Sequence, residues 1–159
     1  MFREMRRTKQ ALPREECIDL LKSEVRGVLS VLGDEGYPYG VPHNHFYCEE
    51  DGKLYFHSGM SGHKIDALRA CDKASYVVMD SGTHRDPEDW ALYFRSVIVF
   101  GRIEIVEDHD KAIALTRRLC RKFTDDEAYI EEEIRHAGAR TLVFSLTPEQ
   151  ISGKVVHEK

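Results

Sequence analysis

The segment HSGMSGHK at residues 57–64 combines hydroxyl, glycine and basic side chains where a strand pattern gives way to a helical one. Serine hydroxyls donate hydrogen bonds, glycines allow close backbone approach, and Lys64 adds positive charge. The first N–H groups of a following helix favour the same negatively charged ligand. The segment therefore predicts an anion site, although the Walker-type phosphate-loop motif is absent. An ordinary polar turn is the alternative.

Histidines gather in the same part of the chain, which raises the question of a metal site. They are His43, His45, His57 and His63. His43 and His45 stand two residues apart in a predicted strand, so both rings would point to one face, as a metal pair requires. No carboxylate is placed to complete the ligand set. We therefore predict histidines that line a polar cleft, and no metal.

Covalent catalysis has weaker support in this sequence. Ser58 and Ser61 have histidines nearby, but a GxSxG motif and an orienting aspartate are absent. The four cysteines are far apart and form no CxxC pair, which predicts free thiols. They are Cys17, Cys48, Cys71 and Cys120. We assign no catalytic residue.

The elements that must position these residues are mostly strands. Alternating and β-branched runs predict strands over 27–33, 39–48, 53–58, 73–80, 91–108 and 140–146, with a last short one in the tail after 146. Helical spacing predicts helices over 13–25, after residue 62, over 108–123 and over 125–137, and a loop over 81–90. Gly101 is where the longest strand could bend. The sum predicts a mainly β (α+β) fold, a small six-stranded antiparallel barrel with flanking helices.

Length and charge limit the classes of function. We expect one domain over residues 1–159, with a basic arm over 1–12 that becomes ordered only if it docks. The net charge of −5 argues against nucleic acid as a partner. No apolar run approaches the length that crosses a bilayer, so we expect no membrane partner and a cytoplasmic location.

Four motifs in order along the chain carry a family resemblance. They are GYPYGVP at 36–42, LYFHS at 54–58, GHKIDALR at 62–69 and FRSVIVFGRIEIVED at 94–108. Residues 1–155 as a whole resemble the FMN-binding split-barrel superfamily of pyridoxamine 5'-phosphate oxidase-like proteins, and most of all its nitroimidazole-resistance (Nim-type) flavoproteins. The resemblance implies a split barrel that forms a homodimer, with the cofactor FMN bound at the interface.

The resemblance also implies which positions hold FMN. It places Val41, Pro42, His43 and Asn44 beside the isoalloxazine, His57 and Ser58 at the ribityl chain and phosphate, Gly62, His63 and Lys64 at the phosphate, and Ser96 across the dimer. Gly62 and His63 replace the serine and arginine common in the oxidases, so the phosphate should rely more on Lys64 and on backbone groups. The arginine and histidine that hold pyridoxal phosphate near the C-terminus are missing, so vitamin B6 oxidation is not expected.

The resemblance thus implies an FMN-dependent reductase of a small oxidised compound, with nitroaromatics among the candidate substrates. A flavin-binding or redox-sensing module without turnover is one alternative. A heme-binding barrel is another, which the histidines keep open. The sequence leaves open which histidine faces the flavin ring and what the electron donor is.

Overall fold

The computed structural model describes residues 1–84, 86–88 and 90–157. Its helices are α1 (Arg14–Ser23), α2 (His63–Ala70), α3 (His109–Cys120) and α4 (Glu127–Ala137), with 3₁₀ turns η1 (Thr8–Gln10), η2 (Asp34–Gly36) and η3 (Gly138–Arg140). Its strands are β1 (Arg26–Leu32), β2 (Pro38–Asn44), β3 (Phe46–Cys48), β4 (Lys53–Gly59), β5 (Lys73–Met79), β6 (Tyr93–Ile105) and β7 (Thr141–His157). The loop expected over 81–90 includes residues 85 and 89, which lie outside the described residues, as do residues 158–159.

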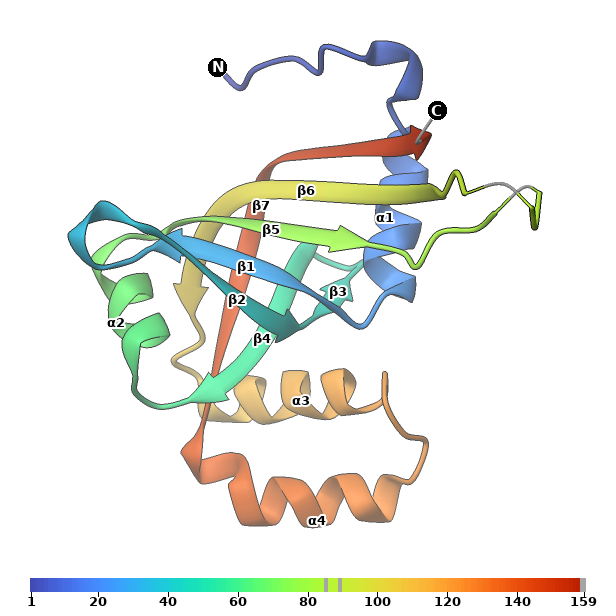
Figure 1. The fold of residues 1–159 in the computed structure, drawn as a ribbon. Helices are drawn as coiled ribbons and strands as arrows, with labels where there is room; N and C mark the ends of the chain where they lie inside the picture. The colour runs from blue at the N-terminus through green and yellow to red at the C-terminus, as the bar shows by residue number, and fades with distance from the viewer. Residues whose placement is uncertain (85, 89, 158–159) are drawn as a thin grey trace.

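The strands form one curled antiparallel sheet in the order β2-β1-β5-β6-β7-β4-β3 (Figure 1). This confirms the predicted mainly β, split-barrel fold, with seven strands in the described chain in place of six. β2 and β3 stand at opposite ends of that order although only His45 separates them in sequence. The sheet must therefore curl until its two edges come near each other.

The prediction of one continuous strand over 39–48 was wrong, and His45 is the reason. Its backbone N–H donates to Val25 O at 3.3 Å, and its fully buried ring lies against Leu21 O and the Tyr76 hydroxyl. Burying a polar ring is favourable only when its nitrogens find such partners. The chain therefore turns inward at His45. β2 ends before this residue, and the chain after it forms β3, which pairs with β4.

The two longest strands depend on one irregularity in their pairing. The register of β6 with β7 shifts between Phe100 and Gly101, so that Gly101 faces Pro148. A Cβ at Gly101 would lie 2.1 Å from Thr147 O, so glycine is required for the close approach. Pro148 is tolerated there because a bulge interrupts the hydrogen-bond ladder. Gly101 thus lies within the single strand β6, so of one long bent strand or two strands joined there, the structure has one. β7 is one 17-residue strand rather than two short ones.

The N-terminal arm docks on the end of β7. Ala11 bridges to Lys154, and the Leu12 N–H donates to Gly153 O at 2.9 Å. Gly153 permits this because a Cβ there would lie 2.4 Å from Cys17 Sγ. Two residues after this contact the chain enters α1, which packs against β6 and β7.

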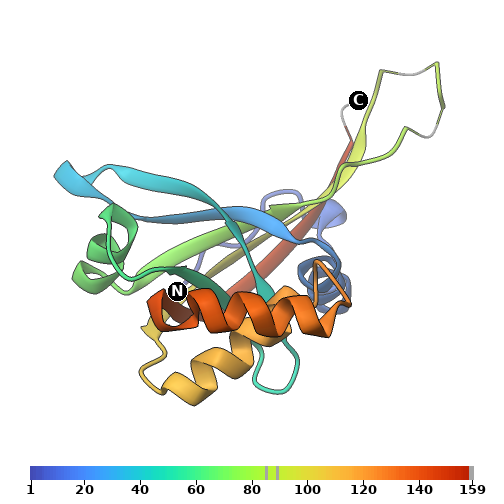
Figure 2. The same ribbon diagram turned by 90° about the horizontal axis from the view of Figure 1, so that it is seen from below.

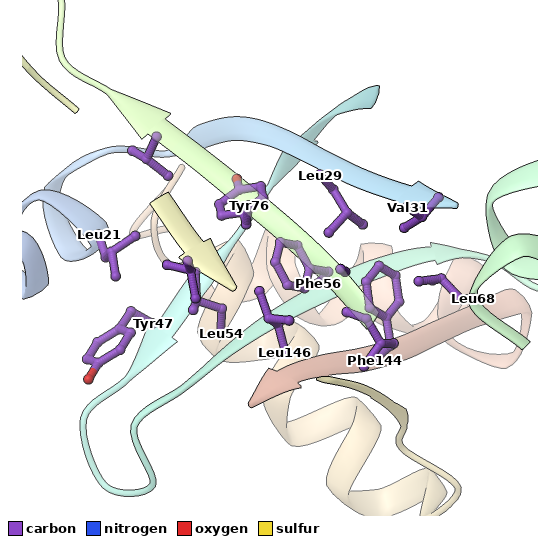
Figure 3. Close-up of a cluster of buried hydrophobic side chains, with 14 of the residues drawn as sticks. Leu21, Leu29, Val31, Tyr47, Leu54, Phe56, Leu68, Tyr76, Phe144 and Leu146 are labelled. Atoms are coloured by element: carbon purple, nitrogen blue, oxygen red, sulfur yellow. The ribbon is translucent and has the colours of Figure 1, made fainter. Parts of the chain in front are cut away.

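The core fills the inside of the curl. Phe56 and Phe144 stack with ring centroids 5.1 Å apart, and Tyr76 meets Phe56 edge-on (Figure 3). Leucines and valines from the sheet and from α1 and α2 complete it; they include Leu20, Leu21, Leu29, Val31, Leu54, Leu68, Val78, Val97, Val99 and Leu146. α3, whose N-cap Asp108 accepts a hydrogen bond from the Lys111 N–H at 2.9 Å, lies beside α4, and the pair covers one end of the sheet (Figure 2). Among the described residues, none of the helices has the length and hydropathy needed to cross a membrane.

Candidate functional site

A cleft of about 670 Å³ opens where β2 and β4 end, at the split in the curled sheet. Five parts of the chain line it: the start of β1, the end of β2, the end of β4, the first turn of α2, and the junction between α4 and β7. The lining residues are Arg26, Pro42, His43, Asn44, His57, Ser58, Gly59, Lys64, Ala137, Arg140 and Thr141.

The turn from β4 into α2 sets the position of Lys64. Gly62 precedes the helix with φ 118° and ψ 168°, a conformation that favours glycine. No atom of the described residues beyond its chain neighbours lies within 4 Å of where a Cβ would stand. The turn places Lys64 in the first helical turn, with its half-buried side chain in the cleft wall. Burial lowers the pKa of this lysine from its ordinary value.

His43 and Lys64 form a direct contact at the floor of the cleft. Lys64 Nζ donates to His43 Nε2 at 2.8 Å, and His43 Nδ1–H donates to Asn44 O at 3.1 Å. Both bonds are satisfied only by the neutral ring. Burial first, and then the Lys64 charge, lower the His43 pKa to about 4. His43 therefore acts at neutral pH as a hydrogen-bond acceptor that holds Lys64.

Asn44 holds a second cation on the other side of the same strand end. Arg26 Nε–H donates to Asn44 Oδ1 at 2.8 Å. A third cation, Arg140, reaches the cleft from η3. Among the described residues, the cleft lining contains no carboxylate, although the whole chain carries a net charge of −5. Three positive groups without a local counter-charge make this cleft an attractive site for an anion.

His57 presents a buried polar atom without a partner. Its Nδ1 makes no hydrogen bond to any described residue. Burial, followed by the Lys64 charge, lowers its pKa. An unsatisfied buried nitrogen costs free energy, so a ligand that bonds to it would be favoured. Ser58, the next residue, offers a hydroxyl in the same wall.

His45 lies outside the cleft and is fully occupied. Its Nε2 lies 2.6 Å from Leu21 O and its Nδ1 lies 2.9 Å from the Tyr76 hydroxyl. Burial is the main cause that lowers its pKa to about 3. The described residues contain no group of histidine, cysteine and acidic side chains arranged to hold a metal ion. The ring of His45 therefore serves the core rather than the site.

The structure brings together six of the ten predicted residues and separates the other four. Pro42, His43, Asn44, His57, Ser58 and Lys64 line the cleft. Val41 belongs to β2 and Gly62 directly precedes α2, but neither residue is in the lining. His63 stacks on Tyr39 at 4.2 Å and points its Nε2 toward the Asp34 carboxylate, 3.5 Å away. Ser96 lies on β6, opposite Met79 and Lys154.

Sequence reasoning missed Arg26 and Arg140 as site residues. Each stands at the start of a strand, Arg26 in β1 and Arg140 directly before β7. A basic residue at a strand end is common and carries no signal by itself. Only the curl of the sheet brings these two positions into one cleft with Lys64.

A comparison with family models matches residues 13–155 to the family described as pyridoxamine 5'-phosphate oxidase. No protein with a curated description matches the chain in sequence.

Solved structures show the same fold. A candidate 5-nitroimidazole antibiotic resistance protein from Bacteroides thetaiotaomicron is 20% identical over 92% of this chain and 87% of that chain, with a TM-score of 0.76. A FAD-binding protein from Mesorhizobium loti is 27% identical over 92% and 97% of the two chains, with a TM-score of 0.66. A FAD and heme binding protein from Mycobacterium smegmatis is 22% identical over 92% and 73%, with a TM-score of 0.74.

Proposed function

Because the chain belongs to the pyridoxamine 5'-phosphate oxidase family, we propose that its cleft binds a flavin, and specifically FMN. The observation that carries this proposal is the cluster of three cations in a cleft whose described lining residues include no carboxylate. A phosphate monoester matches that charge. The described relative from Mesorhizobium loti, which binds FAD, supports a flavin as the class of ligand.

The residues of the cleft fit such a ligand at both ends. Lys64 and the first N–H groups of α2 suit the phosphate. His57 Nδ1 and the Ser58 hydroxyl are free to bond the ribityl hydroxyls. Pro42 and the backbone at the end of β2 would form the wall beside the ring system. His43 contributes indirectly, because its Nε2 holds Lys64 in place.

We further propose that the protein is an FMN-dependent reductase of a small oxidised compound, for which a nitroaromatic is the first candidate. The bound flavin would supply the hydride or electron transfer. The chain would bind the cofactor, orient it and shape a substrate pocket. The candidate nitroimidazole resistance relative supports this choice of substrate class. A cytoplasmic location stays a prediction.

A homodimer is the third part of the proposal, and an apolar row on the outer face of the sheet supports it. Val28 pairs with Pro42 on one side and with Val77 on the other, and Val77 pairs with Ile98. Paired residues of antiparallel strands point to the same face. Val28, Pro42 and Ile98 are exposed, and Pro42 also lines the cleft. A second copy on this row would cover the cleft edge.

Ser96 fits the same arrangement. It pairs with the exposed Met79, two residues along from the pair of Val77 and Ile98, so its side chain points to the outer face. Ser96 is not part of the cleft lining of its own chain, so it would have to meet the cofactor bound by a partner. This position supports the expectation that Ser96 contacts the cofactor of the second subunit.

An absorbance spectrum of the protein as purified, followed by titration with FMN, tests the cofactor. Flavin bands or saturable binding are expected. A colourless protein that binds no FMN would refute the proposal, and a Soret band would favour the heme alternative. Steady NAD(P)H oxidation with an added nitro compound separates a reductase from a flavin-binding module without turnover.

Lys64→Ala should weaken FMN binding by about 1–3 kcal/mol, the scale of one charge-assisted hydrogen bond. Lys73→Ala is the matched control, because Lys73 is an exposed lysine of β5 outside the cleft lining. Equal affinity in the wild type and Lys64→Ala would mean that the phosphate lies elsewhere.

A further inference from the structure

The position expected to add charge beside Lys64 faces away from the cleft. His63 is exposed, stacks on Tyr39 and approaches Asp34. An imidazole occupied in this way cannot also face a ligand at Lys64. If the cleft holds a phosphate, its second cation must come from another element.

Arg140 is the arginine that the fold brings to that end of the cleft. In the pairing of β4 with β7, Gly59 faces Thr141, and Arg140 comes directly before Thr141. Gly59 is also the last residue of β4, three residues before the Gly62 turn into α2. Arg140 therefore stands beside the segment that leads to Lys64, and both side chains line the same cleft.

The backbone around Arg140 is held from two sides. The Thr141 hydroxyl donates to Ala137 O at 2.9 Å, and the Thr141 N–H donates to Gly138 O. Gly138 is buried against α3, where an added Cβ would lie 2.8 Å from Ile113 Cδ1. The start of the arginine side chain is therefore fixed, which lowers the entropy cost of binding an anion there.

The charge of Arg140 is not neutralised within the described chain. Its guanidinium donates through Nη2 to His136 O at 3.2 Å and forms no ion pair with a described carboxylate. The arginines just before it behave differently: Arg117, Arg121 and Arg135 each pair with a glutamate of α4. Arg26, the other cleft arginine, is held by the Asn44 side chain. Within the part of the chain that the structure describes, Arg140 alone among the three cleft cations has only a backbone carbonyl as its partner.

We propose that Arg140 binds the phosphate of the cofactor together with Lys64, and so supplies the positive charge that His63 does not. This inference rests on the proposed binding of FMN in the cleft. The guanidinium would donate hydrogen bonds to the phosphate oxygens from the β7 side, while Lys64 and the start of α2 approach from the other side.

Riboflavin provides the decisive comparison, because it carries the same ring and ribityl chain without the phosphate. Arg140→Gln is expected to raise the Kd for FMN about ten- to a hundredfold, the loss of one charged hydrogen-bonding partner. The Kd for riboflavin should stay within about twofold, since no phosphate contact exists to be lost. The Kd of Arg140→Lys for FMN should lie between the values for the wild type and for Arg140→Gln.

Two control variants complete the set. Arg135→Gln removes an exposed arginine of α4 that pairs with Glu132 and lies outside the cleft lining, and it should leave both affinities unchanged. His63→Ala should also leave FMN affinity unchanged.

The outcomes separate the two proposals. A wild-type protein that binds neither FMN nor riboflavin refutes the proposed function itself. If the wild type binds FMN and Arg140→Gln binds it equally well, only the role of Arg140 is wrong. If Arg140→Gln weakens the binding of FMN and of riboflavin equally, this role is also overturned. The arginine would then support the ring or the fold rather than bind the phosphate.

Discussion

Acidification from pH 8 to pH 5 should destabilise the flavin-free protein by about 2 kcal/mol through His43 alone. The side chain is 7% exposed and its pKa lies near 4, against 6.5 for a solvated histidine. Burial and the positive charge of Lys64 both disfavour the imidazolium ion.

The sign follows from which state takes up the proton first. The unfolded chain binds it near pH 6.5 and the folded chain only near pH 4, so stability is lost as the pH falls through this window. The full difference corresponds to about 3 kcal/mol once both states are protonated, and to about 2 kcal/mol at pH 5.

Urea unfolding of the wild type and of His43→Gln at both pH values measures this contribution. Glutamine keeps a donor for Asn44 O and an acceptor for Lys64 but does not titrate. His45 and His57, which also have lowered pKa values, contribute to both proteins and cancel in the difference. The wild type should lose about 2 kcal/mol more than the variant.

Equal losses in the wild type and His43→Gln would refute the reasoning. An NMR titration in which the His43 ring protonates near pH 6.5 would do the same. Lys64→Met should raise the midpoint of that titration, because it removes the lysine charge, which is one of the two main causes of the lowered His43 pKa.

Three further predictions concern the fold and the dimer. Tyr76→Phe removes a hydroxyl that donates to His43 O at 2.6 Å and lies 2.9 Å from His45 Nδ1. Urea unfolding should therefore show that the free energy of unfolding falls by about 2–3 kcal/mol. A fall of less than about 0.5 kcal/mol would mean that these groups find other partners. Gly101→Ala places a Cβ 2.1 Å from Thr147 O and should lower stability by about 3 kcal/mol. Gly59→Ala, with open space around the new methyl group, should cost less than about 1 kcal/mol in the same assay, and equal costs would contradict the close approach. Ile98→Glu, at the end of the apolar row, should shift a dimer to monomers in analytical ultracentrifugation, whereas an unchanged sedimentation coefficient would place the interface elsewhere.

The local pattern of the sequence was enough for most elements. Alternation and β-branched residues predict strands, and apolar side chains at helical spacing predict helices, because each depends on neighbours within a few residues. The Asp108 cap and the bend at Gly101 belong to this class. The break at His45 does not, since its cause is the set of buried partners Leu21 and Tyr76, which lie far away in sequence.

The candidate site divides in the same way. Ser58 and Lys64 were predictable from residue types suited to an anion, and His43 and His57 as histidines that line a polar cleft. Pro42 and Asn44 were assigned only by the family resemblance. The positions of Arg26 and Arg140 in the cleft were not predictable. Neither residue belongs to a motif, and each lies at a strand start that could face any direction.

By itself, then, the amino-acid sequence determined the strand and helix content, the family resemblance and the polar segment at the end of β4. The tertiary structure decided which charges meet. The curl of the sheet brings positions 26, 64 and 140 to one cleft, turns His63 toward Asp34 and leaves His57 Nδ1 without a partner among the described residues. These outcomes depend on contacts between distant segments, and hydrophobic periodicity along the chain specifies only which face of each element is buried.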